Sequence, residues 1–321
     1  MLSSLKFLIS HEVIELKFKK EKNDKGNIEE SIVKVVLFIM AITSTVSLGL
    51  IAFYIFKEGM PFMFNYGISD FIFGTTWDPT NEVYGILPMI IGSVLATILA
   101  ILIGAPIGIA VAVYLVEIAP PRVAKIIRPA ILLMEGIPSV VIGLFGMVVI
   151  IYMIRWVARG PFSDYLPANY QTGYSLLAGA LILAIMILPT IISISADSIR
   201  AVPKEHKEAA LALGATKWQA VSRVVVPAAK SGILAAVILG VGRAIGETMA
   251  IIMVVGNTVQ IPHPGLEGVF APIRTLTGNI ALEMGYAGPE HRQALFATGV
   301  ILFIFIIIIN SITLILRKKE A

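Results

Sequence analysis

Two opposite charges lie four residues apart inside an apolar stretch of this chain. Arg243 and Glu247 interrupt the run of small and apolar residues from Ser231 to Gly256. In a continuous helix, positions i and i+4 share one face, so the guanidinium and the carboxylate are predicted to pair. A guanidinium stays charged at physiological pH and presents planar, paired donors to an oxyanion. The chemistry that these residue types support is therefore reversible binding of an anion.

The position of the arginine leaves two interpretations open. Arg243 lies about midway along the run. A central arginine costs about 2.5–3.5 kcal/mol on membrane-insertion scales, so its helix face must look into protein or water. The pair either fixes helix packing or forms part of an anion pathway, in which Glu247 weakens the grip on the anion. In the second case Thr248 adds a hydroxyl donor. Gly242 and Gly246 are predicted to let a neighbouring helix approach closely.

A second unusual stretch is "EGIPS" at 135–139, at the start of another apolar segment. A proline near the start of a helix is the ordinary explanation of this pattern. The alternative is a flexible hinge or a gate carboxylate on the pathway, built from Glu135, Gly136 and Pro138.

The residue types do not support catalytic or metal chemistry. The chain has no cysteine, which excludes disulfides and thiolate sites. It has no Gly-Lys dipeptide, so a Walker A phosphate loop is absent and any ATP must be bound by another chain. His263 and His291 have no partners at ligand spacing, and both are predicted to be outer-loop residues. We therefore expect no catalytic residue and no metal site.

The composition predicts the elements that hold these residues. Apolar residues make up 57% of the 321-residue chain, charged residues make up 14%, and the mean hydropathy is +0.88. Soluble chains carry about a quarter charged residues, so this chain is predicted to be an integral membrane protein. Six apolar segments are long enough to cross a bilayer core of about 30 Å. They are predicted at 31–56, 85–116, 131–154, 174–196, 231–256 and 294–316.

The basic residues predict the orientation. If both termini lie in the cytoplasm, 18 of the 25 lysines and arginines fall in cytoplasmic segments and 5 in outer segments. This bias follows the positive-inside rule and accounts for the positive net charge without a nucleic-acid partner. Trp77 falls near an outer boundary, as an interfacial anchor would. The predicted parts are a cytoplasmic tail at 1–30, a first span with its outer loop at 31–84, a five-span core at 85–316 and a cytoplasmic C-terminus at 317–321.

The cytoplasmic loop at 203–230 is the most specific segment of the chain. The stretch "KEAALALGATKWQAVSRVVVPAAKSG" at 207–232 predicts two short helices around a turn. Gly214 is placed to end the first helix in the left-handed conformation, and Thr216 with Gln219 forms a capping box for the second. Pro227 is predicted to stop the second helix before the next span.

This loop resembles the EAA signature of ABC-transporter permeases. Glu208, Ala209 and Ala210 are followed after three residues by Gly214, and nine residues later by a Val-Val-Val-Pro ending. Valine there replaces the isoleucine and leucine of the signature. In that family the loop is a coupling helix that docks on an ATPase subunit. The resemblance therefore implies that Glu208, Ala209, Ala210, Gly214 and Trp218 contact a partner ATPase.

Three further stretches resemble the permeases of phosphate-uptake ABC transporters, and the PstC family more closely than the partner PstA family. They are "EGIPSVVIGLFG" at 135–146, "GRAIGETMAIIMVVGN" at 242–257 and "RTLTGNIALEMGYA" at 274–287. The resemblance covers about residues 85–316 and implies an all-α, six-span, MetI-like bundle of the type I importers. It further implies import of inorganic phosphate across the cell membrane with a second permease chain, an ATPase dimer and an external phosphate-binding protein. The ATPase would use ATP and Mg²⁺, and this chain would bind no cofactor.

Two other functions stay open from the sequence. An ABC permease for another oxyanion or for an organic solute would carry the same EAA loop. An ion-coupled secondary carrier or channel would use Arg243 and Glu247 as a proton relay, although the EAA spacing argues against it.

Overall fold

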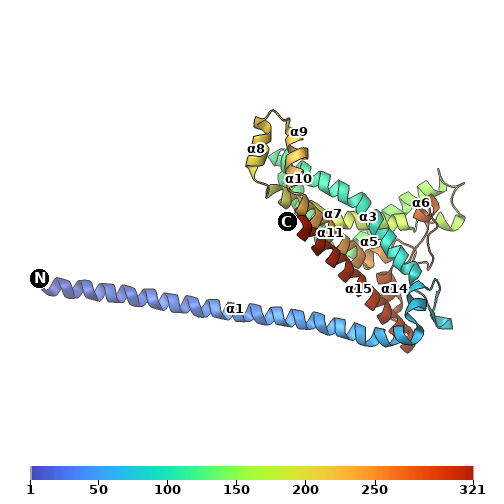
Figure 1. Cartoon of the computed structure of the whole chain (residues 1–321), viewed down its shortest axis with the longest axis horizontal. Coiled ribbons are helices and arrows are strands. Elements are labelled where there is room, and N and C mark those ends of the chain that lie inside the picture. The colour runs from blue at the N-terminus through green and yellow to red at the C-terminus, as the bar shows by residue number, and fades with distance from the viewer. Residues whose placement is uncertain (1, 321) are drawn as a thin grey trace. The chain divides into compact units, whose positions relative to one another are not determined.

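Figure 1 shows the computed structural model, which describes residues 2–320, with side chains described for residues 32–309 and 311. The chain divides into two compact units, residues 1–57 and residues 58–321. The first unit holds most of helix α1 (Leu2–Tyr66), which runs without interruption from the expected tail at 1–30 into the first span. The second unit holds the remaining elements.

The second unit is mainly helical. Its longer α-helices are α3 (Leu87–Val113), α4 (Pro121–Glu135), α6 (Ile151–Arg159), α7 (Leu176–Arg200), α8 (Lys204–Ala212), α11 (Lys230–Gly246), α14 (Leu276–Glu283) and α15 (Pro289–Glu320). The shorter ones are α2 (Ile68–Phe73), α5 (Ser139–Phe145), α9 (Lys217–Ala220), α10 (Val226–Ala228), α12 (Met249–Ile252) and α13 (Leu266–Phe270). Three π-helical turns are η2 (Tyr114–Ile118), η3 (Gly146–Ile150) and η5 (Val221–Val225), and two 3-10 turns are η1 (Pro79–Asn81) and η4 (Ala168–Tyr170). Strands β1 (Trp77–Asp78) and β2 (Val83–Tyr84) pair antiparallel.

The predicted spans correspond to helices. Among the described residues, five helical segments are long and apolar enough to cross a membrane. They are Ile32–Tyr66, Leu87–Ile118, Ser139–Arg159, Leu176–Arg200 and Pro289–Ile309. A sixth candidate is the pair Lys217–Ala228 and Lys230–Gly246, which is bent by 67°. Helices suit this environment because each backbone N–H and C=O finds its partner within the same segment.

Two of the predicted span boundaries that lie beside candidate site residues are wrong. The sequence predicts the third span from residue 131, but α4 ends at Glu135 and the span begins at Ser139. Pro138 explains the break, because proline cannot donate a backbone hydrogen bond and disfavours helical geometry at the residue before it. The sequence predicts that the fifth span continues to residue 256, but α11 ends at Gly246. Glu247 has extended backbone angles, with φ −69° and ψ 131°.

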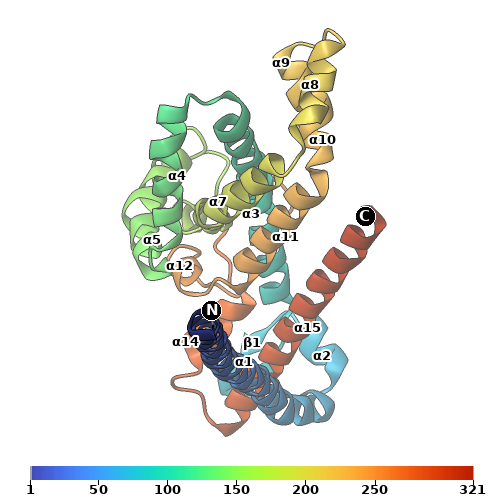
Figure 2. The same ribbon diagram turned by 90° about the vertical axis from the view of Figure 1, so that its left-hand side faces the viewer.

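Helices α3, α7 and α11 form the centre of the bundle, where small residues allow close packing (Figure 2). A Cβ at Gly108 would come within 2.8 Å of Ile191 Cγ2, and a Cβ at Gly240 within 3.1 Å of Ile191 Cδ1. Two glycines therefore let α3 and α11 approach the same isoleucine of α7. At Gly242 and Gly246, where the sequence predicts a close approach, a Cβ would meet nothing within 4 Å, so no helix among the described residues of this chain packs closely there.

The loop at 203–230 forms the predicted helical hairpin, which projects from the bundle in both views (Figures 1 and 2). Gly214 has φ +87°, the left-handed conformation, and the capping box between Thr216 and Gln219 is present. The first helix of the hairpin, α8, begins at Lys204 and ends at Ala212. Pro227 lies inside α10, so the chain turns at Ala229, two residues later than predicted.

Candidate functional site

Arg243, Glu135 and Thr190 meet at one point, and we call them the arginine cluster. Arg243 Nη1 lies 3.4 Å from Glu135 Oε1 and donates to Thr190 Oγ1 at 3.0 Å. The Thr190 hydroxyl donates in turn to Glu135 Oε1 at 3.3 Å. The cluster joins the last turn of α11, the last residue of α4 and the middle of α7. Three segments that are remote in sequence therefore hold one guanidinium.

The helix ends account for the charges in this cluster. Arg243 lies at the C-terminus of α11, where the partial negative charge of the helix dipole favours a cation. Glu135 also ends its helix, so the dipole of α4 disfavours its carboxylate and pairing with Arg243 offsets that cost. The guanidinium of Arg243 contacts both Glu135 and Thr190 through the same nitrogen, Nη1. Within the described residues, Nε and Nη2 remain available to another partner.

The cluster is partly open to solvent. The side chain of Arg243 is 31% exposed and that of Glu135 is 43% exposed. An ion pair at this exposure contributes only about 0–1 kcal/mol, because water screens the attraction. The pair is therefore weak enough to be displaced by a competing anion, unlike a buried salt bridge.

The predicted pair between Arg243 and Glu247 is wrong. Glu247 lies outside α11, and its Oε1 accepts from the backbone N–H of Ala250 at 3.1 Å. Its carbonyl oxygen accepts from Thr277 Oγ1 at 3.1 Å. The i+4 relation needs a continuous helix, and here the carboxylate caps the next short helix, α12. Glu247 is a neighbour of the arginine cluster in sequence but not a member of it.

The other predicted pathway residues have separate places. The Thr248 hydroxyl donates to the carbonyl of Gly246 at 3.3 Å, so its bond is local. Gly136 caps the end of α4 and Pro138 precedes the start of α5, so both form the break next to Glu135. The structure thus brings only the gate candidate Glu135 to Arg243. The sequence interpretation misses Thr190, although a hydroxyl directly after Pro189 within an apolar span is a usable signal.

The tip of the hairpin exposes apolar side chains. Leu213 is 90% exposed and Trp218 is 62% exposed. Gly214 lies between them, and a Cβ there would meet nothing within 4 Å. Glu208 and Ala209 are exposed on α8, whereas Ala210 is half-buried. An exposed leucine and tryptophan at the end of a projecting hairpin form a surface suited to a protein partner.

A buried polar network lies in the predicted outer segments. The Glu283 carboxylate accepts from Trp77 Nε1 at 2.8 Å and from Arg274 Nη1, and its Oε2 lies 2.8 Å from His291 Nε2. The prediction that His291 is an outer-loop residue is wrong, because it is buried in the first turn of α15. Trp77 is also buried rather than displayed as an anchor. Local spacing carries no signal of this network, because the partners lie up to 206 residues apart.

Comparisons with known proteins agree with this architecture. The family model described as "Binding-protein-dependent transport system inner membrane component" matches residues 104–320. The inward-facing MetNI methionine ABC transporter aligns with a TM-score of 0.51 at 19% identity, over 74% of this chain and 94% of that chain. This likeness concerns the fold, and with the span helices it confirms the predicted all-α, MetI-like bundle.

Several known proteins are similar over most of their length. The probable ABC transporter permease protein YqgH of Bacillus subtilis is 42% identical, over 76% of this chain and 77% of the relative. The phosphate transport system permease protein PstC of Mesorhizobium japonicum is 36% identical, over 85% of each chain. PstC of Pasteurella multocida is 34% identical, over 78% of this chain and 81% of the relative. This chain belongs to the family of binding-protein-dependent transport system inner membrane components, as a multi-pass membrane permease.

Proposed function

We propose that this chain is the permease subunit of an ATP-driven importer that carries inorganic phosphate across the cell membrane. The observation that carries the proposal is the arginine cluster, in which a partly exposed guanidinium is held by a displaceable carboxylate. The similarity to permeases named for phosphate transport supports the choice of substrate.

The geometry suggests how the cluster handles an anion. A phosphate ion competes with Glu135 for Arg243, because both present oxygens to the same guanidinium. The Thr190 hydroxyl donates to whichever oxygen replaces that of Glu135. When the anion leaves, the carboxylate returns, which keeps binding weak enough for release. The role predicted for Glu247 thus passes to Glu135, beside the break between α4 and α5.

The remaining machinery lies on other chains. A partner ATPase dimer would hydrolyse ATP with Mg²⁺ and dock on the hairpin through Glu208, Ala209, Ala210, Gly214 and Trp218. A second, PstA-like permease completes the membrane part. An external phosphate-binding protein docks on the segment at 257–293, where Tyr286 is 71% exposed and Leu266 is 52% exposed. This chain does no covalent chemistry, binds no cofactor, and has both termini in the cytoplasm.

The alternatives are weaker. An importer for another oxyanion or an organic solute needs the same hairpin, and the name of the Bacillus relative specifies no substrate. An ion-coupled carrier needs a relay between Arg243 and Glu247, but Glu247 caps α12 instead.

The test is ATP hydrolysis by the reconstituted complex with its binding protein, compared for phosphate, sulfate and phosphonate. Phosphate should stimulate hydrolysis in the wild type and fail to do so with Arg243→Gln, since the amide lacks the charge and the guanidinium fork. Arg159→Gln, at an exposed arginine in the last turn of α6, is the matched control. Stimulation by sulfate alone, or full stimulation of Arg243→Gln, would refute the proposal.

A further inference from the structure

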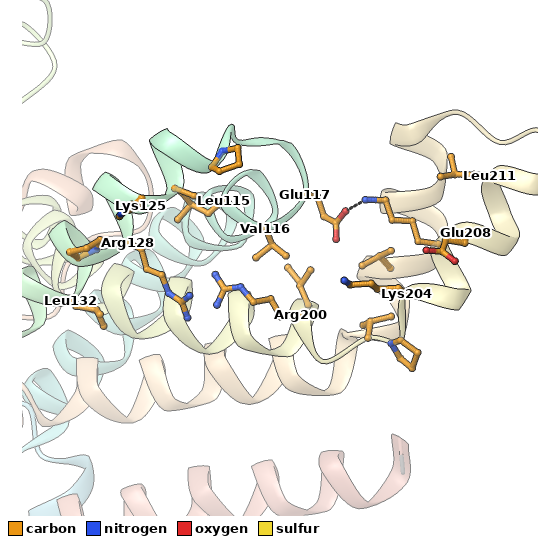
Figure 3. Close-up of a pocket in the computed structure, with 18 residues that line it drawn as sticks. Leu115, Val116, Glu117, Lys125, Arg128, Leu132, Arg200, Lys204, Glu208 and Leu211 are labelled. Atoms are coloured by element: carbon orange, nitrogen blue, oxygen red, sulfur yellow. Dashed lines mark hydrogen bonds and ion pairs between the residues drawn. The ribbon is translucent and has the colours of Figure 1, made fainter.

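A cavity of about 960 Å³ opens between the ends of two spans and the hairpin (Figure 3). Its walls come from η2, from the neighbouring helix α4, from the end of α7 and from α8. Five cationic side chains line it, against two carboxylates, Glu117 and Glu208. The cations are Lys125, Arg128, Arg200, Lys204 and Lys207. The excess of positive charge predicts an anionic occupant.

Part of this positive charge is not neutralised by the protein. Lys207 pairs with Glu117, a contact drawn in Figure 3. Arg128 and Arg200 share a single oxygen, Asp197 Oδ1, at 3.2 Å and 2.9 Å, so one carboxylate serves two guanidiniums. Within the described residues, neither Lys125 nor Lys204 has an ion-pair partner. These two lysines, from α4 and α8, are the cations most available to a ligand.

The rest of the lining is apolar. Leu115, Val116, Leu132 and Leu211 are seen beside the charged groups in Figure 3. A small, strongly hydrated ion gains nothing from such walls, because burying apolar surface favours an apolar ligand. A ligand that fits both parts has an anionic group joined to a hydrocarbon portion.

The position of the cavity at the ends of two membrane spans indicates where such a ligand comes from. The last turn of the candidate span Leu87–Ile118 and the last residue of the candidate span Leu176–Arg200 lie in the cavity wall. The wall therefore lies where apolar membrane helices give way to polar structure. Helix α4 also exposes large apolar side chains, with Ile126 73% and Leu133 74% exposed, as in a helix lying at a membrane surface. The basic residues around the cavity assign this end of the two spans to the cytoplasmic leaflet.

We propose that this cavity binds the phosphate headgroup of an anionic phospholipid of the cytoplasmic leaflet. Lys125 and Lys204 hold the phosphodiester oxygens, and the apolar wall receives the glycerol backbone and the first acyl carbons. Because the two lysines lie on α4 and α8, the lipid connects the surface helix to the coupling hairpin. The inference rests on the cavity and the membrane spans, independently of the transported substrate.

The test uses the permease assembled with its ATPase in phosphatidylcholine nanodiscs that contain increasing fractions of phosphatidylglycerol. A phosphatidylglycerol analogue with a photoreactive group near the headgroup should label peptides that contain residues 115–132 and 199–208. In the Lys125→Gln/Lys204→Gln variant, half-maximal labelling should need about thirtyfold more of the lipid, at about fivefold for each lysine near an anionic surface. Lys125→Gln alone should give about a fivefold shift.

The control variant is Arg122→Gln/Lys217→Gln, which removes two exposed cations on α4 and α9 outside the cavity wall and should not shift labelling. Equal labelling of the two double variants would overturn the proposal. Displacement of the probe by excess inorganic phosphate would overturn the assignment to a lipid in favour of a soluble anion. Labelling that is lost whenever the ATPase is bound would show that the ATPase covers the cavity, which also overturns it.

Discussion

Replacing Glu135 by glutamine tests the competition between a carboxylate and the transported anion at Arg243. The two charged groups are 3.4 Å apart, which corresponds to about 5 kcal/mol of attraction at an effective dielectric constant of 20. Desolvation and solvent screening offset most of this, because the side chains are 31% and 43% exposed. A net contribution of about 0.5–1 kcal/mol remains. Without the carboxylate, Arg243 should bind phosphate about two- to fivefold more tightly.

The maximal rate of transport should fall even though phosphate binds more tightly. Glu135→Gln should lower the phosphate concentration for half-maximal uptake by that same factor and also lower the maximal rate, since tighter binding slows release. Glu247→Gln should not tighten binding, because Glu247 caps α12 through Ala250 N and its amide oxygen can still accept there. Glu82→Gln, at an exposed carboxylate between η1 and β2 and outside the segment assigned to the binding protein, is the neutral control.

The assay is uptake of labelled phosphate into vesicles, with permease abundance measured by immunoblot in the same membranes. The refuting result is a tightened response in Glu247→Gln together with an unchanged response in Glu135→Gln. That pattern would mean that Glu247 is the competitor and that the arginine cluster serves only to pack the helices.

Three further perturbations address the hairpin, the hydroxyl and the buried network. Gly214→Val should uncouple ATP hydrolysis from transport, since valine resists φ +87°, and Glu208→Lys should weaken ATPase binding; normal uptake and ATPase co-purification in both variants would contradict the coupling assignment. Thr190→Val keeps the side-chain shape but removes the donor to Glu135, so import should fall while membrane abundance stays unchanged; a fall in abundance alone would make the hydroxyl structural. Glu283→Gln leaves Arg274 without its ion-pair partner inside the protein, so the free energy of unfolding should fall by about 3–5 kcal/mol. The thermal unfolding temperature should therefore drop, and an unchanged melting curve would contradict this.

Features that depend on neighbours in the chain are predictable. The apolar segments, the left-handed Gly214 and the capping box of Thr216 with Gln219 all follow from local patterns, and the structure contains them. The EAA spacing likewise lies within one short loop, which is why the residues of that loop are enough to indicate the family.

The ends of the helices are less predictable. Pro138 signals a break, but its effect reaches back to Glu135 and turns the start of a span into a separate helix. Nothing in the run around Gly246 marks the end of α11 clearly. There the carboxylate of Glu247 makes a local bond to Ala250 N instead of turning toward Arg243. A choice between two partners depends on which geometry the surrounding packing allows.

The sequence by itself determined that Arg243 is a charge inside an apolar helix that needs a partner and contact with water. Only the tertiary structure decided that the partner is Glu135, 108 residues away, with Thr190 of α7 between them. The physical reason is that helical periodicity relates residues within one continuous helix and carries no information on how separate helices pack. For the same reason, the sequence did not predict that His291 pairs with Glu283, or that α4 and α8 together line one basic cavity.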